Sequence, residues 1–355
     1  MKTTSAAGRT WHFSHVLGRI TAEHNESEYG RTGGFAYPMD VAVANDDMLF
    51  VLSRGLGYET AGYVGDIYCR IGKTTFDEDH IGDFARGGFT WPNSIALSNE
   101  GNVFCSDEYE HCIYVFEPDK IYPFPESEPG GESILKWGIK GSKPGQLNGP
   151  TGIDFDLKDQ LYVVDSLNHR IQLFTKEGAL LTTWGKEGRE NGEFNRPWGI
   201  TVDSANNIYV ADWGNNRVQK LSPDGAHIQT FGTTEDPAAA LDHPSGVAVD
   251  TEGDVYVVDW GNNRVQIYEP DGEIITSLYG DATEFSKAGQ YNLERDPESV
   301  KVFNRNEGLK LKSYLSKFGR PIGITIDKNN RIIITDGRGR LHVYVKDQEY
   351  AEPPV

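Results

Sequence analysis

The chain has 355 residues, 40 of them glycine, and a formal charge of −19 at pH 7. Proteins that bind the nucleic acid backbone carry a basic face, so this charge argues against DNA or RNA as the main partner. The first twenty residues lack the apolar core of a secretory signal, and no window approaches the roughly 20 apolar residues of a membrane helix. Three cysteines make no disulfide framework. We therefore expect a cytoplasmic protein that binds neither nucleic acid nor a membrane.

The first predicted strand runs from Trp11 to Leu17 and ends at Gly18, after an N-terminal tail over residues 1–10. An aromatic or aliphatic residue followed by glycine ends a strand again at Trp137, Trp184, Phe231 and Tyr279. The N-terminal segment therefore resembles the last strand of a unit whose other strands do not precede it in the sequence.

From residue 35 on, one pattern occurs six times. Each copy has a proline, an apolar strand, a turn, a second apolar strand that in five copies ends in Asp, and a third strand. The copies begin at Pro38, Pro92, Pro150, Pro197, Pro244 and Pro321. Two intervals, 150 to 197 and 197 to 244, are 47 residues long. A repeat of this length with several short strands is typical of a β-propeller, so we predict an all-β, six-bladed propeller with four-stranded blades.

Two further features recur at fixed places in the repeats. A large apolar residue, which we call the plug, lies three positions before each proline, where it would fill the space between blades: Phe35, Phe89, Leu147, Phe194, Leu241 and Phe318. In four copies an Arg lies four or five residues after the Asp that ends the second strand, across a tight loop. We predict that each of these pairs forms a structural ion pair: Asp165–Arg170, Asp212–Arg217, Asp259–Arg264 and Asp336–Arg340.

Between Gly280 and the last proline lies an insert over residues 281–320 that the other repeats lack. Asp296-Pro297-Glu298 is a typical helix start, and residues 307–317 have the apolar spacing of a short amphipathic helix. We predict one helical insert that lies on the channel-mouth face, either as a lid or as a docking surface for a protein partner or a second copy of the chain.

The last repeat ends with its third strand, at residues 340–346, and a polar tail follows over residues 347–355. The strand from Trp11 to Leu17 would complete this blade. Such closure leaves no open sheet edge, so we predict one propeller over residues 11–346 whose ring is closed by the N-terminal strand.

The stretches Asn168-His169-Arg170-Ile171 and Asn216-Arg217-Val218, each preceded by Tyr-Val-x-Asp, resemble the signature of the NHL repeat family. The resemblance is close in blades three to five and weaker in the others. It implies a six-bladed propeller. It does not imply one activity, because the family and its relatives include protein-interaction and RNA-binding modules as well as six-bladed lyases and hydrolases.

The candidate site is the mouth of the central channel, where the loops before the first strand and after the second strand should meet. Trp198, Trp213 and Trp260 predict an aromatic wall on blades four and five. Polar groups predict a second wall on blades one and two. The remaining predicted ligand-binding residues are Met39, Asn93, Ser94, Thr151, Ser245, Arg54, Tyr58 and Arg338.

His111, with Tyr109 and Asp40, is the best acid–base candidate. The related peptide-amidating lyases hold zinc through histidines just after the repeat proline, and those six positions contain no His here. Glu59, Asn93 and Asp40 have the chemistry of a calcium lactonase site, but oxygen ligands are too common to predict a metal from them. We predict no metal and no cofactor.

Two functions follow from these residues. The first is a binding module that takes a small molecule or short peptide at the mouth. The alternative is a lyase or hydrolase that acts on a small molecule under the 281–320 insert.

Overall fold

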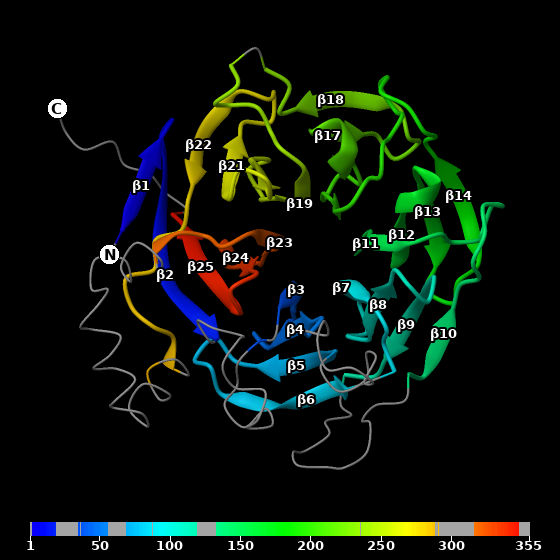
Figure 1. Cartoon of the computed structure of the whole chain (residues 1–355), viewed down its shortest axis with the longest axis horizontal. Helices are drawn as coiled ribbons and strands as arrows, with labels where there is room; N and C mark the ends of the chain where they lie inside the picture. The colour runs from blue at the N-terminus through cyan, green and yellow to red at the C-terminus, as the bar shows by residue number, and fades with distance from the viewer. Residues whose placement is uncertain are drawn as a thin grey trace, which may run out of the picture.

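The structure is a computed structural model, and it describes residues 2–18, 35, 37–55, 69–86, 88–118, 133–234, 236–287, 290 and 316–347. Six antiparallel sheets stand around a common axis as the blades of a propeller (Figure 1). Within the described residues, no helix is both long and apolar enough to span a membrane.

Blades one to five each contain four strands, and the strand nearest the axis begins at the repeat proline in four of them. Blade one comprises β3 (Pro38–Val43), β4 (Leu49–Ser53), β5 (Arg70–Thr74) and β6 (His80–Arg86). Blade two comprises β7 (Pro92–Leu97), β8 (Val103–Asp107), β9 (Cys112–Phe116) and β10 (Leu135–Trp137). Blade three comprises β11 (Pro150–Phe155), β12 (Gln160–Asp165), β13 (Arg170–Thr175) and β14 (Leu180–Trp184). Blade four comprises β15 (Ile200–Val202), β16 (Ile208–Asp212), β17 (Arg217–Leu221) and β18 (His227–Phe231). Blade five comprises β19 (Pro244–Val249), β20 (Val255–Asp259), β21 (Arg264–Tyr268) and β22 (Ile274–Leu278).

Blade six joins the two ends of the chain, as predicted. It contains β23 (Pro321–Ile326), β24 (Arg331–Asp336), β25 (Arg340–Lys346), β2 (Arg9–Gly18) and β1 (Thr3–Ala6). Figure 1 shows the blue N-terminal strands beside the red β25, and β2 pairs with β25 in antiparallel register.

Residues 1–10, expected to be a tail, thus include a fifth strand. Ala7 and Gly8 both have positive φ, which suits the tight turn of a β-hairpin. The 281–320 insert lies for the most part outside the described residues, so its helix stays a prediction.

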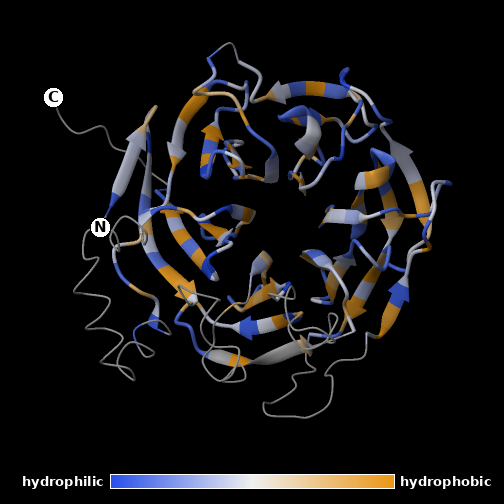
Figure 2. Ribbon diagram, in the orientation of Figure 1, coloured by the Kyte–Doolittle hydropathy of each residue, from blue (hydrophilic) through white to orange (hydrophobic). Residues whose placement is uncertain are grey.

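The core lies between the blades, and Figure 2 shows hydrophobic residues concentrated on the strands. All six predicted plugs are buried. In four places the side chain of a plug would contact a Cβ atom on the glycine that follows a strand, at Gly18, Gly138, Gly185 and Gly232. A Cβ atom on Gly185 would lie 2.6 Å from the Phe194 ring, and its φ of +91° also disfavours a side chain.

The four predicted Asp–Arg pairs are all present. Arg170 Nε lies 2.7 Å from Asp165 Oδ2, and the other pairs span 2.9, 2.7 and 3.0 Å. The second oxygen of Asp165 accepts the backbone N–H of Asn148 at 2.6 Å. Each Asp thus ties the turn after its strand to the loop that precedes the repeat proline, and so fixes the mouth loops. Cys69, Cys105 and Cys112 are free and buried.

Candidate functional site at the channel mouth

The inner strands of the six blades enclose a cavity of about 290 Å³ on the ring axis. The repeat places the same strand of every blade against the axis, so residues far apart in the sequence share this cavity. Six predicted site residues line it: Met39, Asp40, Asn93, Ser94, Trp198 and Ser245.

Asp40 departs from the repeat at the second position after the proline. Four blades have glycine there: Gly152, Gly199, Gly246 and Gly323. The neighbouring inner strand requires this in most blades, because a Cβ on Gly199 would lie 2.6 Å from the Ser245 carbonyl oxygen. Blades one and two carry Asp40 and Ser94 instead. Blade one therefore places a carboxylate in the cavity at a position where four blades have no side chain.

Among the residues that the structure describes, the Asp40 carboxylate accepts hydrogen bonds from neutral donors only. Its Oδ2 accepts the Ser94 hydroxyl at 2.7 Å and the Ile95 N–H at 3.0 Å, and its Oδ1 accepts the Val41 N–H at 2.9 Å. Burial raises the pKa of Asp40 to about 6 despite these hydrogen bonds. The side chain keeps some contact with the cavity, since the residue is half-buried rather than buried.

A second carboxylate, Asp154, lies deeper in the same cavity. Thr201 Oγ1 donates to it at 3.1 Å and the Val202 N–H at 2.9 Å, and burial raises its pKa to about 6. Asp154 lies four residues after its repeat proline and Asp40 two, so Asp154 lies about 7 Å farther from the mouth than Asp40 at 3.3 Å per residue. The described residues that line the cavity include no Lys, Arg or His. Within this described lining, the channel thus presents two carboxylates without a basic side chain beside them.

Paired side chains around the mouth connect neighbouring blades. The Arg54 guanidinium lies over the Trp91 ring at 5.2 Å, Arg320 lies over Trp260 at 5.4 Å, and the His243 and Trp213 rings are 4.2 Å apart. In each pair, one residue follows the second strand of a blade and the other precedes the repeat proline of the next. Of the three tryptophans of the predicted aromatic wall, Trp198 lines the cavity, while Trp213 and Trp260 contact residues of the next blade. Their role as a ligand-binding wall stays a prediction.

Arg54 belongs to a polar group on blades one and two. It donates to the Pro92 carbonyl at 3.0 Å and lies 3.5 Å from Glu108, which also accepts from Asn93 Nδ2 at 3.2 Å. Burial lowers the pKa of Arg54.

His111 and Tyr109 lie on the mouth loops but do not line the cavity. The Nδ1 atom of His111 accepts the Gly149 backbone N–H at 2.9 Å, as His169 Nδ1 accepts the Arg196 N–H at 3.2 Å. Burial lowers the pKa of His111. Tyr109 is 62% exposed. The acid–base role of these two residues stays a prediction, and the contacts of His111 are those of a residue that joins two blades.

Three further predicted residues lie elsewhere. Thr151 is buried and its hydroxyl donates to the Trp198 carbonyl at 2.9 Å. Arg338 Nη1 donates to the Lys317 carbonyl at 3.0 Å. Tyr58 lies outside the described residues. Sequence reasoning overlooked Asp154, although its carboxylate replaces an alanine that three other blades have at the same position.

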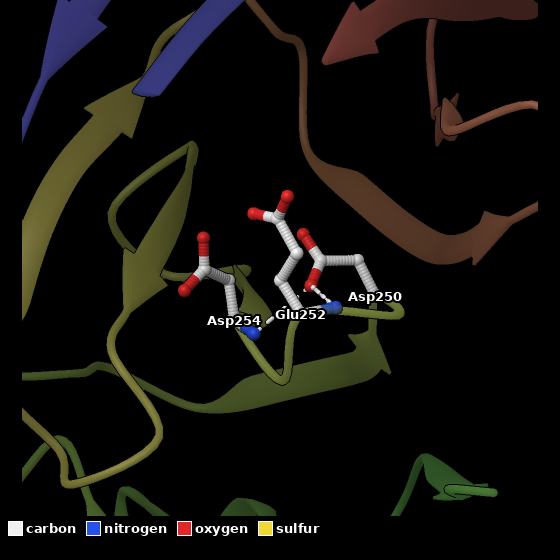
Figure 3. Close-up of side chains that lie close together, drawn as sticks. All are labelled: Asp250, Glu252 and Asp254. Carbon is white, nitrogen blue, oxygen red and sulfur yellow. Dashed lines mark hydrogen bonds between the residues drawn. The ribbon is translucent and has the colours of Figure 1, made fainter. Parts of the chain in front are cut away.

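A separate group of acids has the spacing of a metal site. Asp250, Glu252 and Asp254 come from the turn between β19 and β20 and reach the same side of it (Figure 3), with ligand atoms within 4.8 Å of one another. Lys346 Nζ lies between them, at 2.6, 2.6 and 2.8 Å from their oxygens. An ammonium has three donors, and each is used here. These carboxylates bind a lysine of blade six, so they supply an inter-blade contact.

The model of the NHL repeat matches residues 194–221 and 241–268. No curated protein matches the sequence. Among solved structures, a protein of unknown function from Bacteroides thetaiotaomicron is similar with a TM-score of 0.62 and 17% identity, over 96% of this chain and 76% of that one. A virginiamycin B lyase from Staphylococcus aureus is similar with a TM-score of 0.55 and 12% identity, over 94% of this chain and 99% of that one. A gluconolactonase from Xanthomonas campestris has a TM-score of 0.56 and 13% identity, over 97% of this chain and 98% of that one. At such identities the likeness shows the fold alone.

Proposed function

This chain is an NHL-repeat six-bladed β-propeller, and we propose that it is a ligand-binding module whose channel mouth takes a small molecule or short peptide. A protonated amine of that ligand enters the channel and binds Asp40.

The observation that carries this proposal is the Asp40 carboxylate, which has no basic partner among the described residues and occupies a position where four blades have glycine. A desolvated carboxylate that accepts only neutral donors forms a stronger, charge-assisted hydrogen bond when an ammonium approaches it. Asp154 adds to the negative potential from deeper in the channel. The cavity of about 290 Å³ is at the lower end of ligand pockets, so a chain terminus or a single side chain fits it better than a whole drug-sized molecule.

Ligand-detected NMR with phenethylamine tests the proposal, and phenethyl alcohol serves as its uncharged counterpart. The parent protein should bind the amine and not the alcohol, and Asp40→Asn should lose amine binding. The matched control is Asp46→Asn, an exposed aspartate that does not line the channel. Equal binding of amine and alcohol, or amine binding that survives in Asp40→Asn, would contradict the proposal.

Amine binding should also depend on pH. The pKa of Asp40 is about 6, so the affinity should rise between pH 5 and pH 7 as the carboxyl group ionises while the amine stays protonated. Affinity that is constant over this range would assign the amine to another site.

One observation favours an enzyme as a second candidate. A carboxylate with a pKa of about 6 inside a cavity has the acidity of a general base at neutral pH. In that case Asp40 would act in a lyase or hydrolase reaction. A screen of small esters and lactones tests the enzyme candidate. Turnover that is abolished in Asp40→Asn would support an enzyme, and absence of turnover would favour the binding module.

A further inference from the structure

Asp40 and Asp154 are bound by their surroundings in the same way. Each carboxylate accepts three neutral donors: the N–H of the residue that follows it, a hydroxyl of the next blade, and the N–H of the residue after that hydroxyl. The donors are Val41 N, Ser94 Oγ and Ile95 N for Asp40, and Phe155 N, Thr201 Oγ1 and Val202 N for Asp154, at 2.7 to 3.1 Å. A carboxylate has about four acceptor positions, so each of the two can accept one more donor from a ligand.

The two carboxylates are held apart at different depths and between different blades. Asp40 is two residues after its repeat proline and is held between blades one and two, whereas Asp154 is four residues after its own and is held between blades three and four. Figure 1 shows β3 and β11, which carry them, at the axis with β7 between them. Two residues of a strand correspond to about 7 Å. One calcium ion would bring two ligand oxygens within about 5 Å of each other, which is less than this spacing.

The level of the channel between the two carboxylates is apolar. The third residue after each repeat proline is isoleucine or valine in all six blades, and all of these residues line the cavity: Val41, Ile95, Ile153, Ile200, Val247 and Ile324. From the mouth inward, the described lining therefore offers a carboxylate, an aliphatic zone and a second carboxylate.

The two carboxylates also repel each other. Burial raises the pKa of Asp40 to about 6, and the negative charge of Asp154 adds to this shift. A ligand with one ammonium group neutralises one of the two charges. A ligand with two ammonium groups neutralises both and so removes the repulsion between them.

We propose that the channel binds a linear aliphatic diamine, with one ammonium group on Asp40, the other on Asp154, and the methylene chain against the isoleucine and valine residues between them. This inference rests on the proposed function, because it keeps an amine on Asp40, and it names the ligand class. Four or five methylene groups are needed to bridge about 7 Å, so diamines of the length of putrescine and cadaverine fit best.

Isothermal titration calorimetry at low salt compares putrescine and cadaverine with butylamine and ethylenediamine. Butylamine has the chain but a single charge, and ethylenediamine has two charges on a chain too short to reach both carboxylates. In the parent protein the two longer diamines should bind at least tenfold more tightly than either of these. Asp154→Asn should reduce this preference to less than twofold, because asparagine keeps the size of the side chain and removes its charge.

The charge-matched control is Asp46→Asn, which removes the same charge at an exposed position outside the cavity and should keep the preference. It is needed because a chain with a net charge of −19 attracts any dication. Three results would overturn the inference: longer diamines that bind no more tightly than butylamine or ethylenediamine, a preference that survives in Asp154→Asn, or an equal loss in Asp46→Asn. The comparison of chain lengths uses the parent protein, so it decides the matter even if Asp154→Asn does not fold.

The result can be separated from that of the proposed function. Phenethylamine binding that is lost in Asp40→Asn would still support an amine site at Asp40 when the diamine preference is absent. Loss of both results would refute the amine site itself.

Discussion

Lys346 should contribute measurably to the closure of the ring, and Lys346→Met tests this. Its side chain is 2% exposed and its ammonium contacts Asp250, Glu252 and Asp254 of blade five. Burial alone would lower the pKa of Lys346, but the hydrogen bonds to these carboxylates outweigh it and the pKa is raised. The lysine is therefore charged at pH 7. Methionine has a similar length and volume, so the substitution removes mainly the charge.

The expected cost follows from what each carboxylate loses. Removing one partner of a buried ion pair costs about 3–5 kcal/mol. Glu252 is 49% exposed and regains water, and Asp254 keeps Arg9 at 2.6 Å, so Asp250 bears most of the loss. We expect the lower end of the range, about 3 kcal/mol. With an unfolding entropy of about 2.1 cal/mol/K per residue, this lowers the Tm by about 4 °C.

Differential scanning calorimetry at pH 7 measures this shift. The control is Lys186→Met, whose lysine is 76% exposed and pairs with Glu193 at 3.0 Å, and it should move the Tm by less than about 1 °C. Adding Asp250→Asn to Lys346→Met should recover part of the loss, because it removes the unpaired charge. The reasoning fails if Lys346→Met melts within a degree of the parent, or if the second substitution lowers the Tm further.

Removing residues 1–20 should give insoluble protein or a drop in Tm of more than about 10 °C, because it exposes the β25 edge and removes the fully buried Trp11 and Leu17. Removal of residues 1–7 alone should leave a soluble ring, and a 1–20 deletion that melts within a degree or two of the parent would rule out this closure. Asp40→Ser should become more stable relative to the parent as pH rises from 4 to about 6. The reason is that the folded pKa of about 6 exceeds the ordinary 3.8, so the native parent binds the extra proton and loses stability as that proton leaves. Urea unfolding across this range checks it, and a difference independent of pH would contradict it. Elemental analysis should find no zinc held by histidines at the mouth, and near one zinc per chain would refute that expectation.

Much of this fold could be predicted from the sequence because its contacts repeat. Each blade touches mainly its neighbours, so the same requirement returns at the same position of every repeat. The plug Phe194, the pair Asp212–Arg217 and the strand from Trp11 to Leu17 were all predictable for this reason. A residue that breaks the repeat, such as Asp40, was equally visible as an exception.

The sequence did not show which of the residues that depart from the repeat lie close together in the structure. Asp40 and Asp154 are on different blades and share a cavity only because the ring closes, and the raised pKa of each comes from that enclosure. His111 has the residue type of a catalyst, but its Nδ1 accepts a hydrogen bond from Gly149, and no local pattern shows that contact. The strand over Thr3–Ala6 was missed because its residues are mostly polar and it packs against one neighbour at the rim. The repeated residues specify the contacts between adjacent blades, so these contacts can be predicted from the sequence. The electrostatic potential inside the channel depends on residues from all six blades, so it is determined only when the ring is closed.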